Sequence, residues 1–319
     1  MDDLTEMLEN LGEMRQTRHK EQAFRDYELE SGAIVGAAFG RSGGTMLLNM
    51  LYEHQSELHF GMSGREDKDG GHLLNHVAWP DGPYPLPKYL HPAVMSNTVK
   101  LEHQKEPFQI IKTHLEADYV PHVTHANYFV MVRDPADVFR SSMDFFDRLY
   151  NLNGVSQDEL LFGFVGEGGM LHEWARHTAS WWNRSHLDNT EMMCYNETVA
   201  DRRSAFETID TRLRLSGNSC LQLIDDHSHF GRMNRLMESC SLENMRENGE
   251  FYGLRYFGYK GHVDPMLGEA VAQVSQADRD MIHLEAQASL YRLGAQDFPF
   301  ETMLGRNSIF NIVRYSLDN

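Results

Sequence analysis

Cysteine is scarce in this sequence of 319 residues, and long apolar runs are missing from it. The three cysteines, Cys194, Cys220 and Cys240, are odd in number and too few for a disulfide framework. No Cys/His spacing matches a zinc site, so no metal ligands are predicted. This cysteine usage favours a reducing compartment, and we therefore expect a cytoplasmic protein.

The shortage of positive charge excludes one class of partner. Lys and Arg number 29 against 47 Asp and Glu, which gives a formal net charge of −18. Because nucleic-acid binding requires clustered Lys and Arg to neutralise phosphates, no nucleic-acid partner is expected. No run of about 18 apolar residues occurs, and the N-terminal stretch lacks the apolar segment of a signal peptide, so no membrane partner is expected either.

Length and composition predict one large domain preceded by a short extension. Hydrophobic residues make up 41% of the chain and charged residues 24%, values that are ordinary for a soluble globular protein. Apolar residues between positions 4 and 14 recur at helical spacing. We therefore expect residues 1–30 to form a helical extension and residues 31–319 to form the main domain.

The most informative stretch is 33–51, which reads AIVGAAFGRSGGTMLLNML. It consists of an apolar run typical of a buried parallel strand, a glycine-rich turn, and an apolar helical segment. A strand, a tight turn and a helix N-terminus together present free backbone N–H groups to an anion. The pattern therefore predicts a phosphate-binding turn, although an ordinary strand–helix connection has similar features.

Strand-like and helix-like segments alternate after this turn. Strands are predicted near 108–113, 128–133 and 191–195. One helix is predicted to begin at Pro135. Further helices are predicted over 170–186, 198–214 and 274–293, the last with Ser275 as its N-cap. Alternation of this kind predicts an α/β domain with a central parallel sheet flanked by helices. The glycine- and proline-rich stretches 61–71 and 79–87 are expected to be loops.

An ATP-binding P-loop is one interpretation of the turn. Aligning Arg41 and Ser42 with the Lys-Ser of G-x-x-x-x-G-K-[ST] places Val35 where the first glycine belongs. A nucleotide-triphosphate site also requires an acidic residue at a strand end to help hold Mg²⁺, whereas the third predicted strand ends in Arg133. These differences weaken the interpretation as a kinase or ATPase.

Four segments, taken in order, resemble the cytosolic sulfotransferase family. Arg41-Ser-Gly-Gly-Thr45 is similar to the turn that binds the 5′-phosphosulfate of PAPS, and Ile111-Lys-Thr-His-Leu115 is similar to the family's K-T-H-L segment. The stretch from Val132 to Ser141 resembles its R-[N/D]-x-x-D-V-x-x-S segment, and 241–248 (SLENMREN) resembles S-F-E-x-M-K-x-N. Four ordered matches across roughly residues 33 to 265 make chance an inadequate explanation.

The resemblance implies a P-loop-like turn and a role for each matched residue. His114 is expected to be the general base, because it follows a strand end and can take a proton from an acceptor hydroxyl. Lys112 and Arg41 are expected to stabilise charge on the transferred group. The family pattern assigns donor binding to the turn and to two later residues: Arg41, Ser42, Gly43, Gly44, Thr45, Arg133 and Ser141.

The sequence departs from the family pattern at positions that would contact the adenine of PAPS and in a late glycine loop. Met46 and Leu242 stand where the family commonly has aromatic residues, and Tyr195 corresponds to a Tyr that faces the adenine. The late glycine loop is reduced to Leu254–Asp264, in which Gly261 and one basic residue, Arg255 or Lys260 with Arg255 preferred, are expected to contact the donor. Adenine is therefore expected to contact more aliphatic and less aromatic surface than is usual for the family.

We thus expect a sulfotransferase that uses PAPS, without a required metal, to modify a hydroxyl or amine of a small-molecule acceptor. The product of the donor would be adenosine 3′,5′-bisphosphate. Two alternatives remain open at this point: an ATP-dependent small-molecule kinase with a modified P-loop, and a non-catalytic homologue that only binds a nucleotide. The acceptor is expected between the 61–107 loops and the 145–175 region. The sequence neither indicates nor excludes a homo-oligomer.

Overall fold

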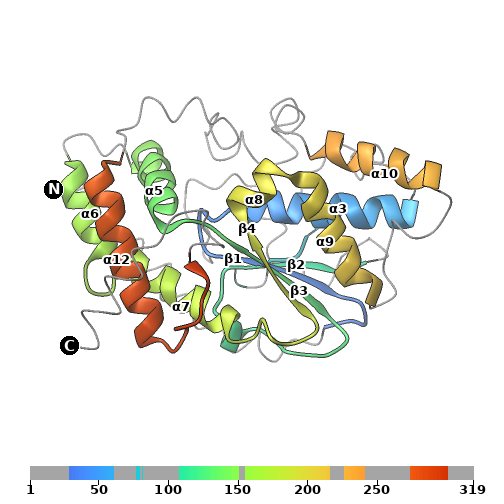
Figure 1. The fold of residues 1–319 in the computed structure, drawn as a ribbon, viewed down its shortest axis with the longest axis horizontal. Coiled ribbons are helices and arrows are strands. Elements are labelled where there is room, and N and C mark those ends of the chain that lie inside the picture. The colour runs from blue at the N-terminus through green and yellow to red at the C-terminus, as the bar shows by residue number, and fades with distance from the viewer. Residues whose placement is uncertain are drawn as a thin grey trace.

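The computed structural model describes residues 29–60, 77–79, 81, 108–150, 155–215, 226–240 and 274–300. Four strands form one parallel sheet in the order β2-β1-β3-β4, with β1 and β3 at its centre (Figure 1). Their bounds are β1 Ile34–Ala38, β2 Ile110–Thr113, β3 Asn127–Val132 and β4 Thr190–Cys194. β1 and β3 are buried along their whole length, as expected for central parallel strands.

Helices connect the strands and cover both faces of the sheet. In the described part of the chain they gather in two groups, one around α3, α9 and α10 and one around α5, α6, α7 and α12 (Figure 1). Their bounds are α3 Gly44–Phe60, η4 Ala117–Tyr119, α5 Pro135–Tyr150, α6 Gln157–Val165, α7 Met170–Trp182, α8 Tyr195–Ala200, α9 Arg202–Leu215, α10 Asp226–Ser239 and α12 Gln276–Arg292.

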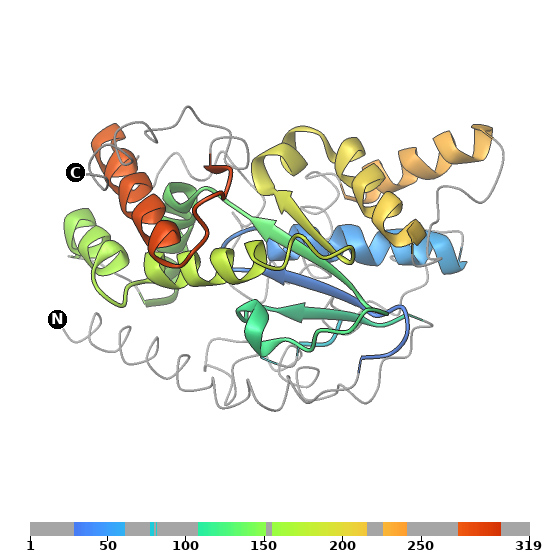
Figure 2. The ribbon, with the colours of Figure 1, turned by 60° about the horizontal axis from the view of Figure 1, so that its bottom comes forward.

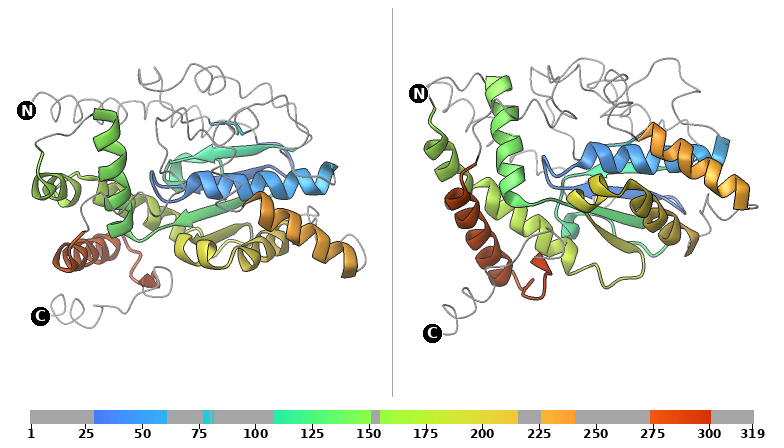
Figure 3. Two further views of the ribbon diagram at one scale, coloured as in Figure 1. Left: turned by 90° about the horizontal axis from the view of Figure 1, so that it is seen from above. Right: turned by 45° about the horizontal axis from the view of Figure 1, so that its top comes forward.

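Alternate residues of the central strands face two separate cores. Ile34 and Met131 pack with α3, α9 and α10 on one face, while Val35 and Val130 pack with α5, α7 and α12 on the other. Gly36 allows α3 to lie close to β1, because a Cβ at this position would meet Leu48 Cδ2 at 2.9 Å. The result is a three-layer arrangement that the turned views also show (Figures 2 and 3).

The predicted α/β fold with a parallel sheet is confirmed, and so are the four strands and the helix capped by Ser275, whose side chain accepts a hydrogen bond from the Asp278 N–H. The helices α6 and α10 were not predicted. Ser156 and Glu159 form a capping box at the start of α6, and this S-x-x-E pattern was an available signal for that helix.

No helix in the described ranges is long and apolar enough to cross a membrane. Residues 1–28 of the predicted extension 1–30 and the whole of the loop 61–71 lie outside the described residues.

Candidate active site

The carboxyl ends of all four strands deliver residues of the sequence motifs to one edge of the sheet. The glycine-rich turn follows β1, His114 follows β2, Arg133 follows β3, and Tyr195 follows β4 as the first residue of α8. Ligands of open parallel sheets bind at this edge, beside the point where the strand order reverses. The topology therefore places three of the four motif segments together with Tyr195, whereas the segment 241–248 lies outside the described residues.

The turn between β1 and α3 has the backbone shape of an anion site. Arg41 has a φ of 67° and Gly43 a φ of 92°, and the Ser42 N–H donates to the Phe39 carbonyl at 3.0 Å. Ser42 is buried, and its hydroxyl oxygen has no hydrogen-bond partner among the described residues. A left-handed conformation at a residue other than glycine is strained and is typical of functional sites. The turn leads directly into the N-terminus of α3, where an anion is favoured.

Tyr195 and Arg133 form one wall of the turn. A Cβ on Gly43 would lie 2.3 Å from Tyr195 Cδ2, so the aromatic ring packs directly against the glycine backbone. The Arg133 guanidinium stacks over this ring at 4.4 Å and donates to the Arg41 carbonyl at 3.0 Å. Its Nε is buried without a hydrogen-bond partner among the described residues. Arg133 thus closes over the turn and retains a buried donor.

Arg41 and Ser141 meet on the same side of the turn. Arg41 Nε and Nη2 donate to the Ser141 hydroxyl at 3.2 and 3.1 Å, although 100 residues separate the two in sequence. The sequence predicted Ser141 beside Arg133 and Arg41 beside the transferred group. The structure brings two guanidinium groups and this hydroxyl around a single turn, which is the donor set of a site for a multiply charged anion.

The tautomer of His114 is fixed by the backbone of β1. Its Nδ1 lies 2.5 Å from the Ala38 carbonyl, and because a carbonyl oxygen only accepts, Nδ1 carries the proton. Nε2 therefore has the free lone pair. Burial, followed by the charge of Lys112, lowers the pKa of His114 to about 3, so the imidazole is neutral at physiological pH. A Cβ on Gly44 would lie 3.9 Å from His114 Cε1, which places the imidazole beside the turn.

Lys112 is a buried cation next to His114. Its ammonium lies 3.5 Å from the ring centroid of Trp79, and burial lowers the pKa of Lys112 to about 8. The negative charge of Asp81 opposes this shift, and the positive charge of Arg41 adds to it. Arg41 is therefore electrostatically close to Lys112 even though its guanidinium bonds to Ser141. Lys112 remains mostly protonated near pH 7 and can bind negative charge.

Trp79 and Asp81 complete this side of the site and were missed from the sequence. The Ala78 N–H donates to the Ile110 carbonyl at 3.0 Å, and the Lys112 N–H donates to the Ala78 carbonyl at 2.7 Å, so this short segment pairs with β2. Trp79 then lies edge-on to His114 at 5.5 Å, and the Asp81 carboxylate accepts from the His114 N–H at 2.7 Å. Burial raises the pKa of Asp81 to about 6.

His177 on α7 is a second histidine behind the site, also missed from the sequence. It is buried, and burial lowers its pKa to about 3. Its ring contacts Phe39 edge-on at 6.1 Å, and its proximity contributes to the low pKa of His114. Only its spacing on α7 marks it in the sequence, and helical spacing does not separate a core histidine from one beside a site.

The remaining predicted residues divide into two groups. Thr45 is half-buried in the first turn of α3, and Met46 is buried in the core on the α3 face of the sheet, so its contact with an adenine stays a prediction. Leu242, Arg255 and Gly261 lie outside the described residues. Within the described ranges, no cluster of three or more His, Cys, Asp or Glu side chains could hold a metal ion.

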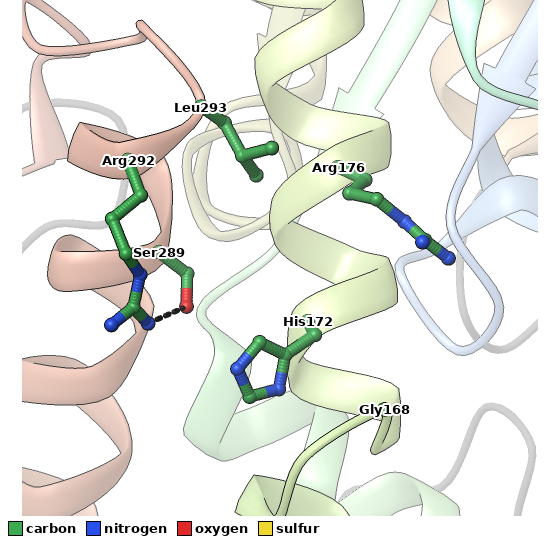
Figure 4. A pocket seen from close by; sticks show the side chains of 6 residues that line it. All are labelled: Gly168, His172, Arg176, Ser289, Arg292 and Leu293. Atoms are coloured by element: carbon green, nitrogen blue, oxygen red, sulfur yellow. Dashed lines mark hydrogen bonds between the residues drawn. The ribbon is translucent and has the colours of Figure 1, made fainter.

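A separate cavity of about 250 Å³ lies between α7 and α12 (Figure 4). Its basic side chains pair with glutamates. His172 lies 3.6 Å from Glu285, and Glu285 also pairs with Arg292 at 2.5 Å. Arg176 lies 3.3 Å from Glu116. Arg176 also points away from α12 in this view. The basic groups therefore do not converge on one point, and none of them belongs to the sequence motifs. The residues that line the cavity are Gly168, His172, Arg176, Ser289, Arg292 and Leu293.

Comparison with known proteins agrees with this arrangement. The model of the sulfotransferase domain family matches residues 33–252, which is more than half of the chain. The chain therefore belongs to the sulfotransferase domain family, a family of enzymes that transfer sulfuryl groups.

Two similar solved structures are of retinol dehydratase, one with retinol and PAP and one with androsterone and inactive cofactor PAP. Each is 17% identical over 89% of this chain and 86% of the other, with TM-scores of 0.56 and 0.59. At this identity they show a shared fold. No curated protein sequence matches the chain significantly.

Proposed function

We propose that this enzyme takes its sulfuryl group from PAPS and transfers it to a hydroxyl or amine of a small-molecule acceptor. The observation that carries the choice of donor is the convergence of Arg41, Arg133 and Ser141 on the glycine-rich turn. PAPS carries phosphate at both its 3′ and 5′ positions, and two guanidinium groups beside a turn fit a ligand with two anionic groups. The PAP bound in both retinol dehydratase structures supports the same choice.

The turn and α3 would hold the 5′-phosphosulfate. The backbone N–H groups around Gly43 and Gly44 and the buried Ser42 hydroxyl are the donors available at the helix N-terminus. Arg133 and Ser141 would hold the 3′-phosphate, with Arg41 between the two groups. The unpartnered Nε of Arg133 provides a buried donor for this purpose. PAPS would supply an activated sulfuryl group whose leaving group is adenosine 3′,5′-bisphosphate.

His114 would act as the general base. Nε2 takes the proton of the acceptor hydroxyl as that oxygen bonds to sulfur, and the bond between sulfur and the bridging oxygen of the donor breaks. The electron pair of that bond leaves with adenosine 3′,5′-bisphosphate. Lys112, placed next to His114, would stabilise the negative charge that develops on the bridging oxygen and on the sulfuryl oxygens.

Calorimetric titration with adenosine 3′,5′-bisphosphate, in the absence of metal, tests the donor. We expect the wild-type protein to bind it and Arg133→Ala to weaken binding by at least about tenfold, since a charge-assisted hydrogen bond is lost. Arg212→Ala is the matched control, because Arg212 pairs with Glu191 near the other end of β4. Failure of the wild type to bind would show that PAPS is not the donor, whereas equal binding by Arg133→Ala would show that Arg133 does not hold the 3′-phosphate.

A further inference from the structure

The helix α12 lies outside the segment that the family model matches. That match covers residues 33–252, whereas α12 spans Gln276–Arg292. α12 runs beside α7 and also contacts α5 (Figures 2 and 4). Because α5 carries Ser141 and begins two residues after Arg133, any contact from α12 to the start of α5 acts close to the proposed 3′-phosphate site.

One side chain of α12 bonds to the residue that joins β3 to α5. Asp134 is buried, and its Oδ1 accepts from the Ala136 N–H at 2.8 Å, as a helix-capping carboxylate does. The same oxygen lies 2.9 Å from Nε2 of His283, whose side chain is 8% exposed. Since a carboxylate only accepts, His283 is the donor. The orientation of the capping carboxylate therefore depends on a residue 149 positions later in the chain.

A second side chain of α12 holds the first turn of α5. Both Nη atoms of Arg279 donate to Asp137 Oδ1 at 3.2 Å, and each side chain is 15% exposed. From another side, Trp174 of α7 donates its Nε1–H to the Arg133 carbonyl at 3.1 Å. The corner between β3 and α5, residues 133–137, is thus fixed by bonds from two different helices.

We propose that His283 and Arg279 are positioning residues for recognition of the 3′-phosphate. They hold the corner 133–137 so that Arg133, which starts it, and Ser141, two turns into α5, face the same turn. This inference rests on the proposed PAPS function. Among the described residues, the hydrogen bonds of the His283 and Arg279 side chains go to Asp134 and Asp137, and neither of these belongs to the predicted donor-binding set. Small displacements of a binding group weaken its contacts strongly. Loss of the bonds from His283 and Arg279 should therefore lower the affinity for the 3′-phosphate in particular.

A second physical effect acts in the same direction. Asp134 is adjacent to Arg133, and both Asp134 and Asp137 carry negative charge near the site for an anion. In the structure, donors from α12 bond to both carboxylates. Without those donors, less of the negative charge of the two carboxylates is compensated, and this charge competes with a phosphate for the Arg133 guanidinium.

The test compares two nucleotides that differ only in the 3′-phosphate. Calorimetric titration of full-length protein with adenosine 3′,5′-bisphosphate and with adenosine 5′-monophosphate gives the preference for the 3′-phosphate as a ratio of Kd values. We expect His283→Leu and Arg279→Ala each to reduce this ratio by about tenfold, the magnitude of a lost charge-assisted hydrogen bond. Binding of adenosine 5′-monophosphate should stay within about twofold of wild type.

Two matched variants separate positioning from general damage. His283→Gln keeps an N–H donor and is expected to restore most of the ratio that His283→Leu loses. Arg292→Ala, also on α12, removes a side chain that is 59% exposed and bonds to Glu285 and Ser289, and it should leave the ratio unchanged. If His283→Leu does not fold, Arg279→Ala decides the question alone.

The possible failures are distinguishable. A wild-type protein that does not bind adenosine 3′,5′-bisphosphate, or shows no preference for it, overturns the proposed function and this inference with it. A wild-type preference that persists in folded His283→Leu and Arg279→Ala overturns the inference only. An equal loss of affinity for both nucleotides also overturns it, because that result indicates a merely structural role for α12.

Discussion

The Nδ1 atom of His114 donates to the carbonyl oxygen of Ala38 at 2.5 Å, and this bond joins the end of β2 to the last residue of β1. It fixes which imidazole nitrogen carries a proton and leaves Nε2 as the acceptor. A general base needs both the free lone pair and a defined direction. The glycine-rich turn begins just after Ala38, so one short hydrogen bond sets the base relative to the proposed donor site.

Removal of this base should strongly reduce turnover without affecting donor binding. We expect His114→Ala to lower kcat by about 10²- to 10⁴-fold, the usual contribution of a general base. Affinity for adenosine 3′,5′-bisphosphate, measured by calorimetry, should change little. His186→Ala is the control, because His186 is exposed beyond the end of α7. Unchanged turnover of His114→Ala in an assay of sulfuryl transfer would show that another group is the base.

The pH dependence of catalysis should report on Lys112. Its pKa is lowered to about 8 by burial, so above this pH the ammonium loses its proton and its ability to stabilise negative charge. We expect kcat/KM to fall by about tenfold per pH unit on the alkaline side. Lys112→Arg keeps its charge at every accessible pH, so its profile should stay flat there, although at lower overall activity. A decline of the same shape in Lys112→Arg would contradict this assignment.

Asp81 should tune the same titration. Its negative charge raises the pKa of Lys112, while its carboxylate accepts from the His114 N–H. Asp81→Asn removes the charge but keeps an oxygen that can accept this bond. The alkaline limb of the pH profile, which is the fall of kcat/KM at high pH, should therefore move to lower pH. Asp118→Asn, with a side chain that is 77% exposed, is the control and should leave the limb in place. An identical limb in Asp81→Asn and wild type would exclude this coupling.

Two glycines of the turn should respond differently to the same substitution. Gly43 has a φ of 92°, and a Cβ there would overlap the ring of Tyr195 at 2.3 Å, whereas a Cβ on Gly40 meets nothing within 4 Å. We expect Gly43→Ala to destabilise the protein by about 1–3 kcal/mol, from backbone strain and the steric conflict, and to weaken nucleotide binding. Gly40→Ala should be close to neutral. Urea denaturation and calorimetry of both variants provide the comparison, and equal stability would show that the turn relaxes freely.

The sheet and most of its helices were predictable because the signals are local. Apolar runs such as 33–39 have the composition of buried parallel strands. Ser275 is a residue type that favours the N-cap, and it stands directly before a helical pattern. The meeting of the three described motif segments was predictable for a related reason. In a parallel sheet, residues that follow successive strands meet at one edge whatever the details of packing.

Other features of the site could not be predicted because they depend on contacts between distant segments. Trp79 and Asp81 lie in a proline-rich stretch that reads as a loop, and only the pairing of Ala78 with Ile111 brings them to Lys112. No local pattern distinguishes His177 from an ordinary core histidine.

The sequence by itself determined the fold class, the family and the sheet edge at which the three described motif segments meet, because periodicity, turn chemistry and short motifs are encoded within a few residues. Only the tertiary structure decided which groups face one another there. The bond between Arg41 and Ser141, the stacking of Arg133 on Tyr195 and the bonds from His283 and Arg279 to the start of α5 all join residues far apart in the chain. Side-chain direction, burial and the resulting pKa values depend on the packed neighbours, and these exist only once the chain has folded.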